Sequence, residues 1–167
     1  MAYYRDLDPC TYFYLENDDP PVAIGWLGED HDYPRGAVDA KFFERLEFFA
    51  ENNWQRFMYL GHHECELCQY QRPLFNANLF IPYDGRIYAA PAGITHYISA
   101  HWYQPPDVFI QAVTACPDMG TAEYGLALAA NGAREFAQGF EPGWNEKSRE
   151  DVPPPASCII GGCILAR

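Results

Sequence analysis

The middle of this 167-residue chain carries the run Gly61-His62-His63-Glu64-Cys65-Glu66-Leu67-Cys68, whose two cysteines form a Cys-x-x-Cys knuckle. Two histidines, His96 and His101, follow further along the chain on a predicted helix. Two thiolates and two imidazoles make up the ligand set of a closed tetrahedral zinc site, in which no position is left for water. The sequence therefore predicts a structural zinc ion held by Cys65, Cys68, His96 and His101.

The segment between the knuckle and the histidines contains the signal for a β-hairpin. Residues 79–82 and 86–89 flank Tyr83-Asp84-Gly85, and an Asp-Gly pair accepts the positive φ angles that tight turns need. A short hairpin alone is marginal in water, so a metal ion would add stability that the local core lacks. The knuckle, the hairpin and the helix thus form one predicted zinc module over about residues 57–104.

The spacing of the two histidines sets a geometric condition on this site. Their helix, predicted over residues 92–102, must end before Pro105-Pro106. Five residues apart, they lie about 140° from each other around an ideal helix. Both imidazoles reach one ion only if the helix tightens or ends between them. His62 and His63, beside the knuckle, are the substitute ligands.

Other elements are predicted on the N-terminal side of the module. Residues 11–16 and 22–27 are rich in β-branched and aromatic residues and are separated by a strong turn segment, which predicts two strands. A further strand over residues 56–60 leads into the knuckle. Apolar residues at helical spacing predict a helix over residues 41–52, with Asp39 as its N-cap.

Two more helices follow the module, and together the elements predict an α+β fold. One helix spans residues 107–115, and the next runs from about Thr121 to a left-handed cap at Asn131-Gly132. We expect a small antiparallel sheet with three helices and the zinc module, in a single globular domain over residues 1–138. Residues 139–167 are predicted to form a linker and a tail that ends in a small hairpin.

The composition limits the classes of partner. The formal net charge is −12, which disfavours nucleic acid as a direct ligand because phosphate binding needs clustered Lys and Arg. No apolar run is long enough to span a membrane, and the N-terminus lacks a basic segment followed by an apolar stretch. We therefore expect a cytoplasmic protein, in which thiols stay reduced and a Cys-x-x-Cys pair serves a metal better than a disulfide.

Three other interpretations of the cysteine pair are open at this point. In the first interpretation, the cysteines are free thiols and the histidines are ordinary hydrogen-bonded residues. A redox dithiol would sit at a helix N-terminus within a βαβ unit, an alternation that the sequence does not show. Zinc deaminases combine His-x-Glu with a distant Pro-Cys-x-x-Cys, whereas here His62-His63-Glu64 directly abuts Cys65 and no proline precedes it.

Acidic residues and aromatic rings predict a surface that binds another protein. Locally dense acidic residues such as Glu29, Asp30 and Asp32 would steer a cationic partner and raise its association rate, although a solvated surface explains the same charge. Aromatic rings dominate interface hot spots. The predicted partner-binding residues are Trp26, Glu29, Asp30, Asp32, Trp102 and Tyr103.

Several motifs, taken in order, resemble an uncharacterised family of small bacterial proteins. They include Gly25-Trp26-Leu27, His31-Asp32-Tyr33-Pro34-Arg35-Gly36, the Cys65–Cys68 knuckle and His96-Tyr97-Ile98-Ser99-Ala100-His101-Trp102-Tyr103-Gln104-Pro105-Pro106. The resemblance covers roughly residues 3–116. It implies no assigned reaction, so it supports the site residues without naming an activity.

The expected function is that of a non-enzymatic, zinc-stabilised binding protein. In its concrete form this is an immunity or inhibitor protein that occludes a cationic toxin, such as a nuclease. One alternative is a zinc-dependent hydrolytic enzyme, in which Glu64 is the general base and water completes three protein ligands. Another is a zinc-ribbon-like adaptor for nucleic acid, which requires Arg56, Arg72 and Arg86 to converge. Four protein ligands indicate a scaffold, and three with solvent indicate catalysis.

Overall fold

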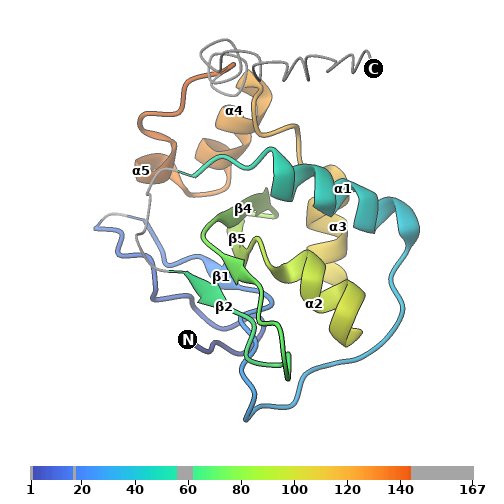
Figure 1. Cartoon of the computed structure of the whole chain (residues 1–167). Coiled ribbons are helices and arrows are strands. Elements are labelled where there is room, and N and C mark those ends of the chain that lie inside the picture. Colours follow the sequence, from blue (N-terminus) through green and yellow to red (C-terminus); the bar gives the residue numbers. More distant parts are fainter. Residues whose placement is uncertain (1, 17, 56–61, 144–167) are drawn as a thin grey trace, which may run out of the picture.

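A β-hairpin lies at the centre of the computed structural model, as the Asp-Gly turn signal predicts (Figure 1). Strands β4 (Asn78–Tyr83) and β5 (Arg86–Pro91) pair antiparallel along their full length of six residues. Asp84 and Gly85 adopt φ angles of 49° and 73°, and a type I′ turn requires positive φ at both central positions. The structure describes residues 2–16, 18–55 and 62–143.

The sheet around this hairpin is mixed rather than purely antiparallel. Strand β1 (Val22–Ala23) pairs parallel to β5, which gives the order β1-β5-β4. A second sheet joins β2 (His63–Glu64) and β3 (Leu74–Phe75) in an antiparallel pair. The α+β class with a small antiparallel sheet is confirmed by the β4–β5 pair, and β1 adds a short parallel edge to it.

The two strands predicted near the N-terminus are mostly absent. Residues 11–16 form turns and bends, because Phe13 inserts its ring beside Trp26 and Phe80, at centroid distances of 6.0 and 4.9 Å, instead of extending along a ladder. Only the first two residues of the predicted strand over 22–27 form β1, and the amide of Ile24 still donates to Ala89 before Gly25, with a φ of 69°, turns the backbone away. The strand predicted over residues 56–60 and the hairpin predicted in the tail lie outside the described residues.

The helices follow the sequence prediction closely. Helix α1 (Ala40–Glu51) begins at Asp39, whose carboxylate accepts hydrogen bonds from the amides of Lys41 and Phe42. The others are α2 (Ile94–His101), α3 (Asp107–Ala115), α4 (Ala122–Ala130) and a short α5 (Arg134–Ala137). Helix α4 ends before Gly132, whose φ of 93° matches the predicted left-handed cap, whereas α5 was not expected.

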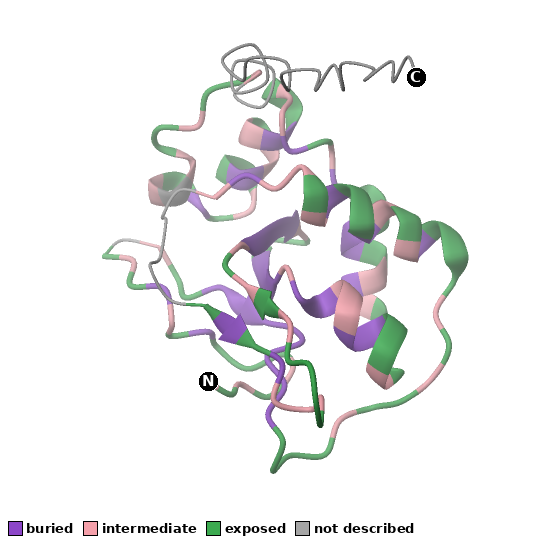
Figure 2. Ribbon diagram, in the orientation of Figure 1, coloured by how far each residue is buried: buried purple, intermediate pink, exposed green. Residues whose placement is uncertain are grey.

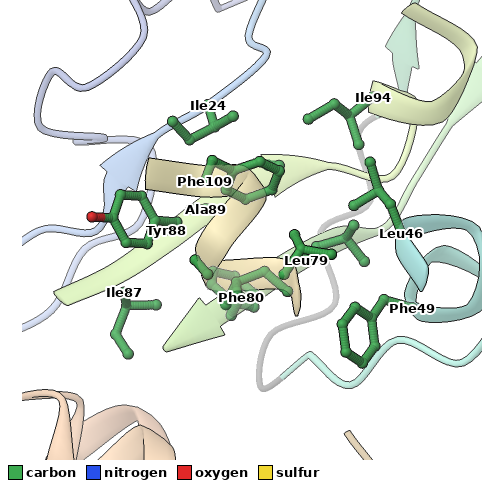
Figure 3. Close-up of a cluster of buried hydrophobic side chains, with 14 of the residues drawn as sticks. Ile24, Leu46, Phe49, Leu79, Phe80, Ile87, Tyr88, Ala89, Ile94 and Phe109 are labelled. Carbon is green, nitrogen blue, oxygen red and sulfur yellow. The ribbon is translucent and has the colours of Figure 1, made fainter. Parts of the chain in front are cut away.

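The core lies where the helices cover the hairpin. Figure 3 shows Leu46 and Phe49 of α1 on the side of Leu79 of β4. Phe109 of α3 packs against Tyr88 of β5, with ring centroids 6.3 Å apart. Figure 2 shows the same hairpin strands as buried while the outer helix faces are exposed. Burial of these apolar side chains supplies most of the driving force for folding. Because β5 leads directly into α2, this core also sets the direction of the helix that carries the two histidines.

Candidate metal centre

The Cys-x-x-Cys knuckle occupies the turn of the small β2–β3 hairpin. The amide of Cys65 donates to the carbonyl of Pro73 at 3.0 Å, which extends the ladder to the first cysteine. On the other side of the turn, Nε of Arg72 donates to the carbonyl of Cys68 at 3.1 Å. These two bonds hold the backbone of both cysteines, so their sulfur atoms are positioned by the hairpin itself.

The two histidines come from the first and last turns of α2. The spacing of the two histidines predicts that the helix tightens or ends between them, and it does neither. Instead, the helix widens at its last turn. The amide of Trp102 donates to the carbonyl of Tyr97 five residues back, the hydrogen-bond spacing of a π-type turn. A wider turn advances fewer degrees per residue, which brings positions 96 and 101 toward the same face. The Nε2 atoms of His96 and His101 are 3.2 Å apart.

All four predicted ligands meet at one point. Their ligand atoms lie within 4.8 Å of one another. Sγ of Cys68 is 3.4 Å from Nε2 of His96, and Nε2 of His101 is 3.3 Å from both sulfur atoms. Tetrahedral ligands at zinc bond lengths of about 2.3 Å to sulfur and about 2.0 Å to nitrogen are roughly 3.3–3.8 Å apart. The geometry is therefore able to hold a metal ion, as the sequence predicts.

The substitute ligands near the knuckle take no part in this cluster. His62 is exposed, and His63 is buried with its ring 4.8 Å from that of Trp26. In the alternating pattern of β2, His63 points into the core and Glu64 points to solvent. Nδ1 of His63 has no hydrogen-bond partner in the described part of the chain.

Burial sets the protonation of the candidate ligands. It raises the pKa of the Cys65 thiol, and the hydrogen bond with Cys68 acts in the same direction. Burial lowers the pKa of His96 and of His101, aided by the charge of His101 in the first case and of Arg35 in the second. Neutral imidazole is the form that binds metal, whereas a thiol must release its proton. The described cysteines are free thiols rather than disulfides.

A close packing contact joins the two halves of the centre. Gly93, which precedes α2, lies against Phe75 of β3, and a Cβ atom on Gly93 would come within 2.4 Å of the ring. The ring of Phe75 is also 5.7 Å from that of His96. Glycine at position 93 thus permits the approach that puts the knuckle hairpin over the first histidine. Neither residue was singled out from the sequence, because nothing local marks a contact between segments so far apart.

The segment that follows the last ligand is paired with residues that directly follow the acidic loop, which we define as residues 29–32. Arg35 and Tyr103 form an antiparallel bridge, the amide of Gly36 donates to Trp102, and the amide of Gln104 donates to Pro34, both at 3.0 Å. We call residues 33–36 and 101–104 the strap. Through it, the acidic loop lies next to the candidate metal centre.

The acidic loop and the knuckle together line a shallow hollow. Its volume is about 430 Å³, and its lining includes Glu29, Asp30, Asp32 and Leu67, one of the two residues between the cysteines. Arg72 lies 3.8 Å from a carboxylate oxygen of Glu29 and 4.0 Å from one of Glu64. Three of the predicted partner-binding residues are thus exposed and gathered beside the knuckle.

The three aromatic residues predicted to bind a partner divide into two groups. Trp26 and Tyr103 are completely buried, so the prediction that they contact a partner is wrong for the folded chain. Trp26 donates from Nε1 to the carbonyl of Ala89 at 2.9 Å and serves the core. Trp102 is 66% exposed and remains available to a partner. Sequence reasoning could not separate them, because aromatic rings suit both cores and interfaces.

Comparison with known proteins gives a family but no activity. The family described as Domain of unknown function (DUF7919) matches residues 2–114, a span that contains all four candidate ligands. No curated protein and no solved structure matches the chain. Among the described helices, none combines the length and the apolar character needed to cross a lipid bilayer.

Proposed function

The chain belongs to the DUF7919 family, and we propose that it is a non-enzymatic, zinc-stabilised protein that binds a cationic protein partner. One observation carries the proposal: four protein ligand atoms lie within 4.8 Å of one another, in a cluster that could supply all four ligands of a tetrahedral ion. A closed set of this kind is typical of structural zinc, whereas catalytic zinc keeps one position open for water or substrate.

Zinc suits the donor set better than other metals do. Tetrahedral sites with two sulfur and two nitrogen ligands indicate zinc or an iron–sulfur cluster, and such clusters are usually held by four cysteines. Among the described residues, only Cys65 and Cys68 supply sulfur to the cluster. When bound, the ion supplies folding free energy by tying the knuckle hairpin to α2, on the order of 10 kcal/mol in small zinc peptides.

The charge supports a cationic partner. The net charge is −12, and exposed carboxylates of the acidic loop lie beside the knuckle, held there by the strap. Such a field raises association rates with positively charged proteins and disfavours acidic ones. An immunity or inhibitor protein that covers the basic surface of a toxin, such as a nuclease, is the concrete form of this function.

The two alternatives receive less support from the geometry. Glu64, the general base of the hydrolytic alternative, is exposed and lies 4.0 Å from Arg72, and four protein ligands would fill a tetrahedral ion without an activated water. The nucleic-acid adaptor needs converging arginines, but Arg72 lies against two carboxylates. Arg86 lines a cavity with Gly132 instead, and Arg56 lies outside the described residues.

X-ray absorption spectroscopy at the zinc edge tests the metal part of the proposal. The purified full chain should contain one zinc ion per chain, surrounded by two sulfur and two nitrogen atoms. A first shell of three protein ligands with an oxygen would instead support the hydrolytic enzyme. A protein that contains no zinc, and takes up none when the ion is added, would contradict the structural role.

Affinity capture with charge variants tests the partner. The double variant Glu29→Gln with Asp30→Asn should lose most of the captured partner, and the loss should be larger at low ionic strength. The matched control is Glu44→Gln with Glu47→Gln on the exposed face of α1, which removes the same charge elsewhere. Equal loss in both variants, or a captured partner of acidic character, would contradict the proposed surface.

A further inference from the structure

A half-buried carboxylate near the N-terminus is held in one orientation by two donors. Oδ1 of Asp6 accepts a hydrogen bond from the amide of Gly25 at 2.8 Å, and Oδ2 accepts one from the hydroxyl of Tyr103 at 2.8 Å. Tyr103 is completely buried and belongs to the strap. Asp6 therefore has a fixed position, although it lies in a segment without regular secondary structure.

This carboxylate lines a cavity of about 440 Å³ beside the acidic loop. Three aromatic rings share the lining with two carboxylates: Tyr3, Tyr4, Tyr33, Asp6 and Asp32. Arg5 also lines the cavity, but its single positive charge is outnumbered by the two carboxylates, so the lining has a net negative charge. The rings are held by their own neighbours, since Tyr3 stacks on His31 at 3.5 Å and Tyr4 packs edge-on against Trp26 at 5.6 Å.

We infer that this cavity is a binding site for an alkylammonium group. Aromatic faces attract cations through their quadrupole, and such a contact contributes roughly 0.5–2 kcal/mol depending on how dry the site is. A positioned carboxylate adds a charge-assisted hydrogen bond, and the two together are the recognition chemistry of an ammonium ion. Tyr33 already accepts a cation on its ring, because the guanidinium of Arg35 lies 4.8 Å from the ring centroid.

The electrostatics of Asp6 agree with this assignment. Burial raises the pKa of Asp6, and the two groups that act in the opposite direction, the Gly25 amide and the Tyr103 hydroxyl, are both neutral donors. A carboxylate desolvated in this way is stabilised when a cation arrives within a few ångströms. An ammonium group in the cavity would supply that charge.

The cavity is connected to the candidate metal centre through the strap. The hydroxyl of Tyr33 reaches the carbonyl of the ligand His101 at 3.4 Å, and the hydroxyl that orients Asp6 belongs to Tyr103, two residues later. A metal ion that holds His101 thus also holds one ring and one hydrogen-bond donor of the cavity. We expect ammonium binding to weaken when the metal is removed.

A lysine side chain of the cationic partner is the source of the ammonium group that we propose, and this choice of source rests on the proposed function. Asp32 lines both this cavity and the hollow beside the knuckle, so a partner on the acidic face would place its basic side chains near the opening. A free small amine carries the same chemistry. A comparison of a lysine derivative with putrescine separates the two sources.

The test is an NMR titration of the zinc-loaded full chain with Nα-acetyl-lysine methylamide. We expect saturable shifts of the Gly25 amide, which donates to Asp6. The uncharged norleucine analogue should cause no saturable shift. Asp6→Asn and Asp32→Asn should each weaken binding about tenfold, since each removes a charged partner. Asp32 is exposed, so its variant folds even if Asp6→Asn does not.

The control variant is Asp84→Asn at the tip of the β4–β5 hairpin, where asparagine also suits the turn. It removes the same charge outside the cavity and should leave binding unchanged. Shifts caused equally by the norleucine analogue, or a loss as large in Asp84→Asn, would overturn the site. Tighter binding of putrescine than of the lysine derivative would retain the site but assign it to a free amine.

The results that would overturn the ammonium site differ from those that would overturn the proposed function. Glu29 and Asp30 do not line the cavity, so their double variant should lose the protein partner while it keeps the titration with the lysine derivative. Ammonium binding without any partner dependent on Glu29 and Asp30 would remove the proposed function and leave the site. If the wild type binds no ammonium compound and partner capture survives Asp6→Asn and Asp32→Asn, the proposed function would stand and the ammonium site would be overturned.

Discussion

Arg35 and Tyr103 pair across an isolated antiparallel bridge, which fastens the acidic loop to the second residue after the last candidate metal ligand. Two separate predictions from the sequence, a metal site and a charged surface, therefore concern one region of the protein. A structural ion bound at this place would do more than stabilise a hairpin. It would also fix the position of the surface that we propose binds a partner.

Removal of one sulfur ligand should release the ion. We expect Cys65→Ser to lose zinc and to lower the free energy of unfolding by about 4 kcal/mol or more, because a metal tie between two segments is lost. Zinc content by mass spectrometry and urea unfolding measure the two effects. Cys116→Ser is the control, since Cys116 is also buried but lies outside the ligand cluster; equal zinc loss in both variants would contradict the assigned ligands.

Chelation of the metal should loosen the strap before it loosens the sheet. The amides of Gly36 and Gln104 bond across the strap, whereas the amide of Ile24 donates to Ala89 in the central sheet. Hydrogen exchange after zinc removal should accelerate at the first two and stay nearly unchanged at Ile24, because the strap contains the candidate ligand His101 whereas the Ile24–Ala89 bond belongs to the central sheet. Uniform acceleration over all three amides would show that the metal supports the whole fold instead.

Gly93→Ala should disturb the approach of the knuckle to α2. The added Cβ would meet the ring of Phe75 at 2.4 Å, and we expect a loss of about 1–3 kcal/mol in stability together with weaker zinc binding. In a Phe75→Ala background the same substitution should be neutral or stabilising, since the collision is gone. Urea unfolding and competition with a coloured chelator measure the double-mutant cycle, and additive effects would exclude the contact as the cause.

Asp6 should make the stability depend on pH in a predictable direction. Burial raises the pKa of Asp6 in the folded protein, so the folded state keeps its proton where the unfolded state has released it. Its contribution is complete below the unfolded pKa and is lost as the pH rises through the folded pKa. The stability of the wild type relative to Asp6→Asn should therefore fall from about pH 4 upward.

The variant Tyr103→Phe tests the pH range over which the contribution of Asp6 to stability is lost. It removes the hydroxyl donor that lowers the pKa of Asp6 in the folded protein, so the fall should begin at the same pH but extend to higher pH. Urea unfolding of the three proteins at each pH gives the differences, in which effects common to all of them cancel. A difference that rises with pH, or stays flat, would contradict the burial of Asp6.

Trp102 has a φ of 61°, a left-handed conformation that costs an L-residue about 1–2 kcal/mol. Its side chain is 66% exposed, so replacing it removes little packing. We expect Trp102→Gly to be more stable than Trp102→Ala by about 1 kcal/mol, because alanine retains the Cβ. Thermal unfolding of the pair measures the difference, and equal stabilities would show that the residue is not strained in solution.

Local chemistry made part of this protein predictable. The Asp84-Gly85 turn, the Asp39 cap and the left-handed cap at Gly132 depend on a few neighbouring residues, and all three are found in the structure. The four candidate ligands also meet as expected. The helix geometry that brings the two histidines together differs from the prediction, since the helix widens after Tyr97 rather than ending between them.

Strand pairing and ring placement were less predictable. The chain from 11 to 16 has the composition of a strand but curls so that Phe13 packs on Trp26, and β1 joins the sheet in parallel. Both outcomes depend on which distant segment offers a partner. The same reason explains why Trp26 and Tyr103 could not be distinguished from the exposed Trp102.

By itself, the sequence determined which atoms can hold a metal ion and where the chain turns, because ligand type and backbone preference belong to individual residues. Only the tertiary structure decided that the acidic loop lies beside the knuckle and that Asp6 and Tyr33 line one cavity. Those relationships join positions more than twenty residues apart in the sequence, and they follow from the packing of the hairpin, α2 and the strap around one core.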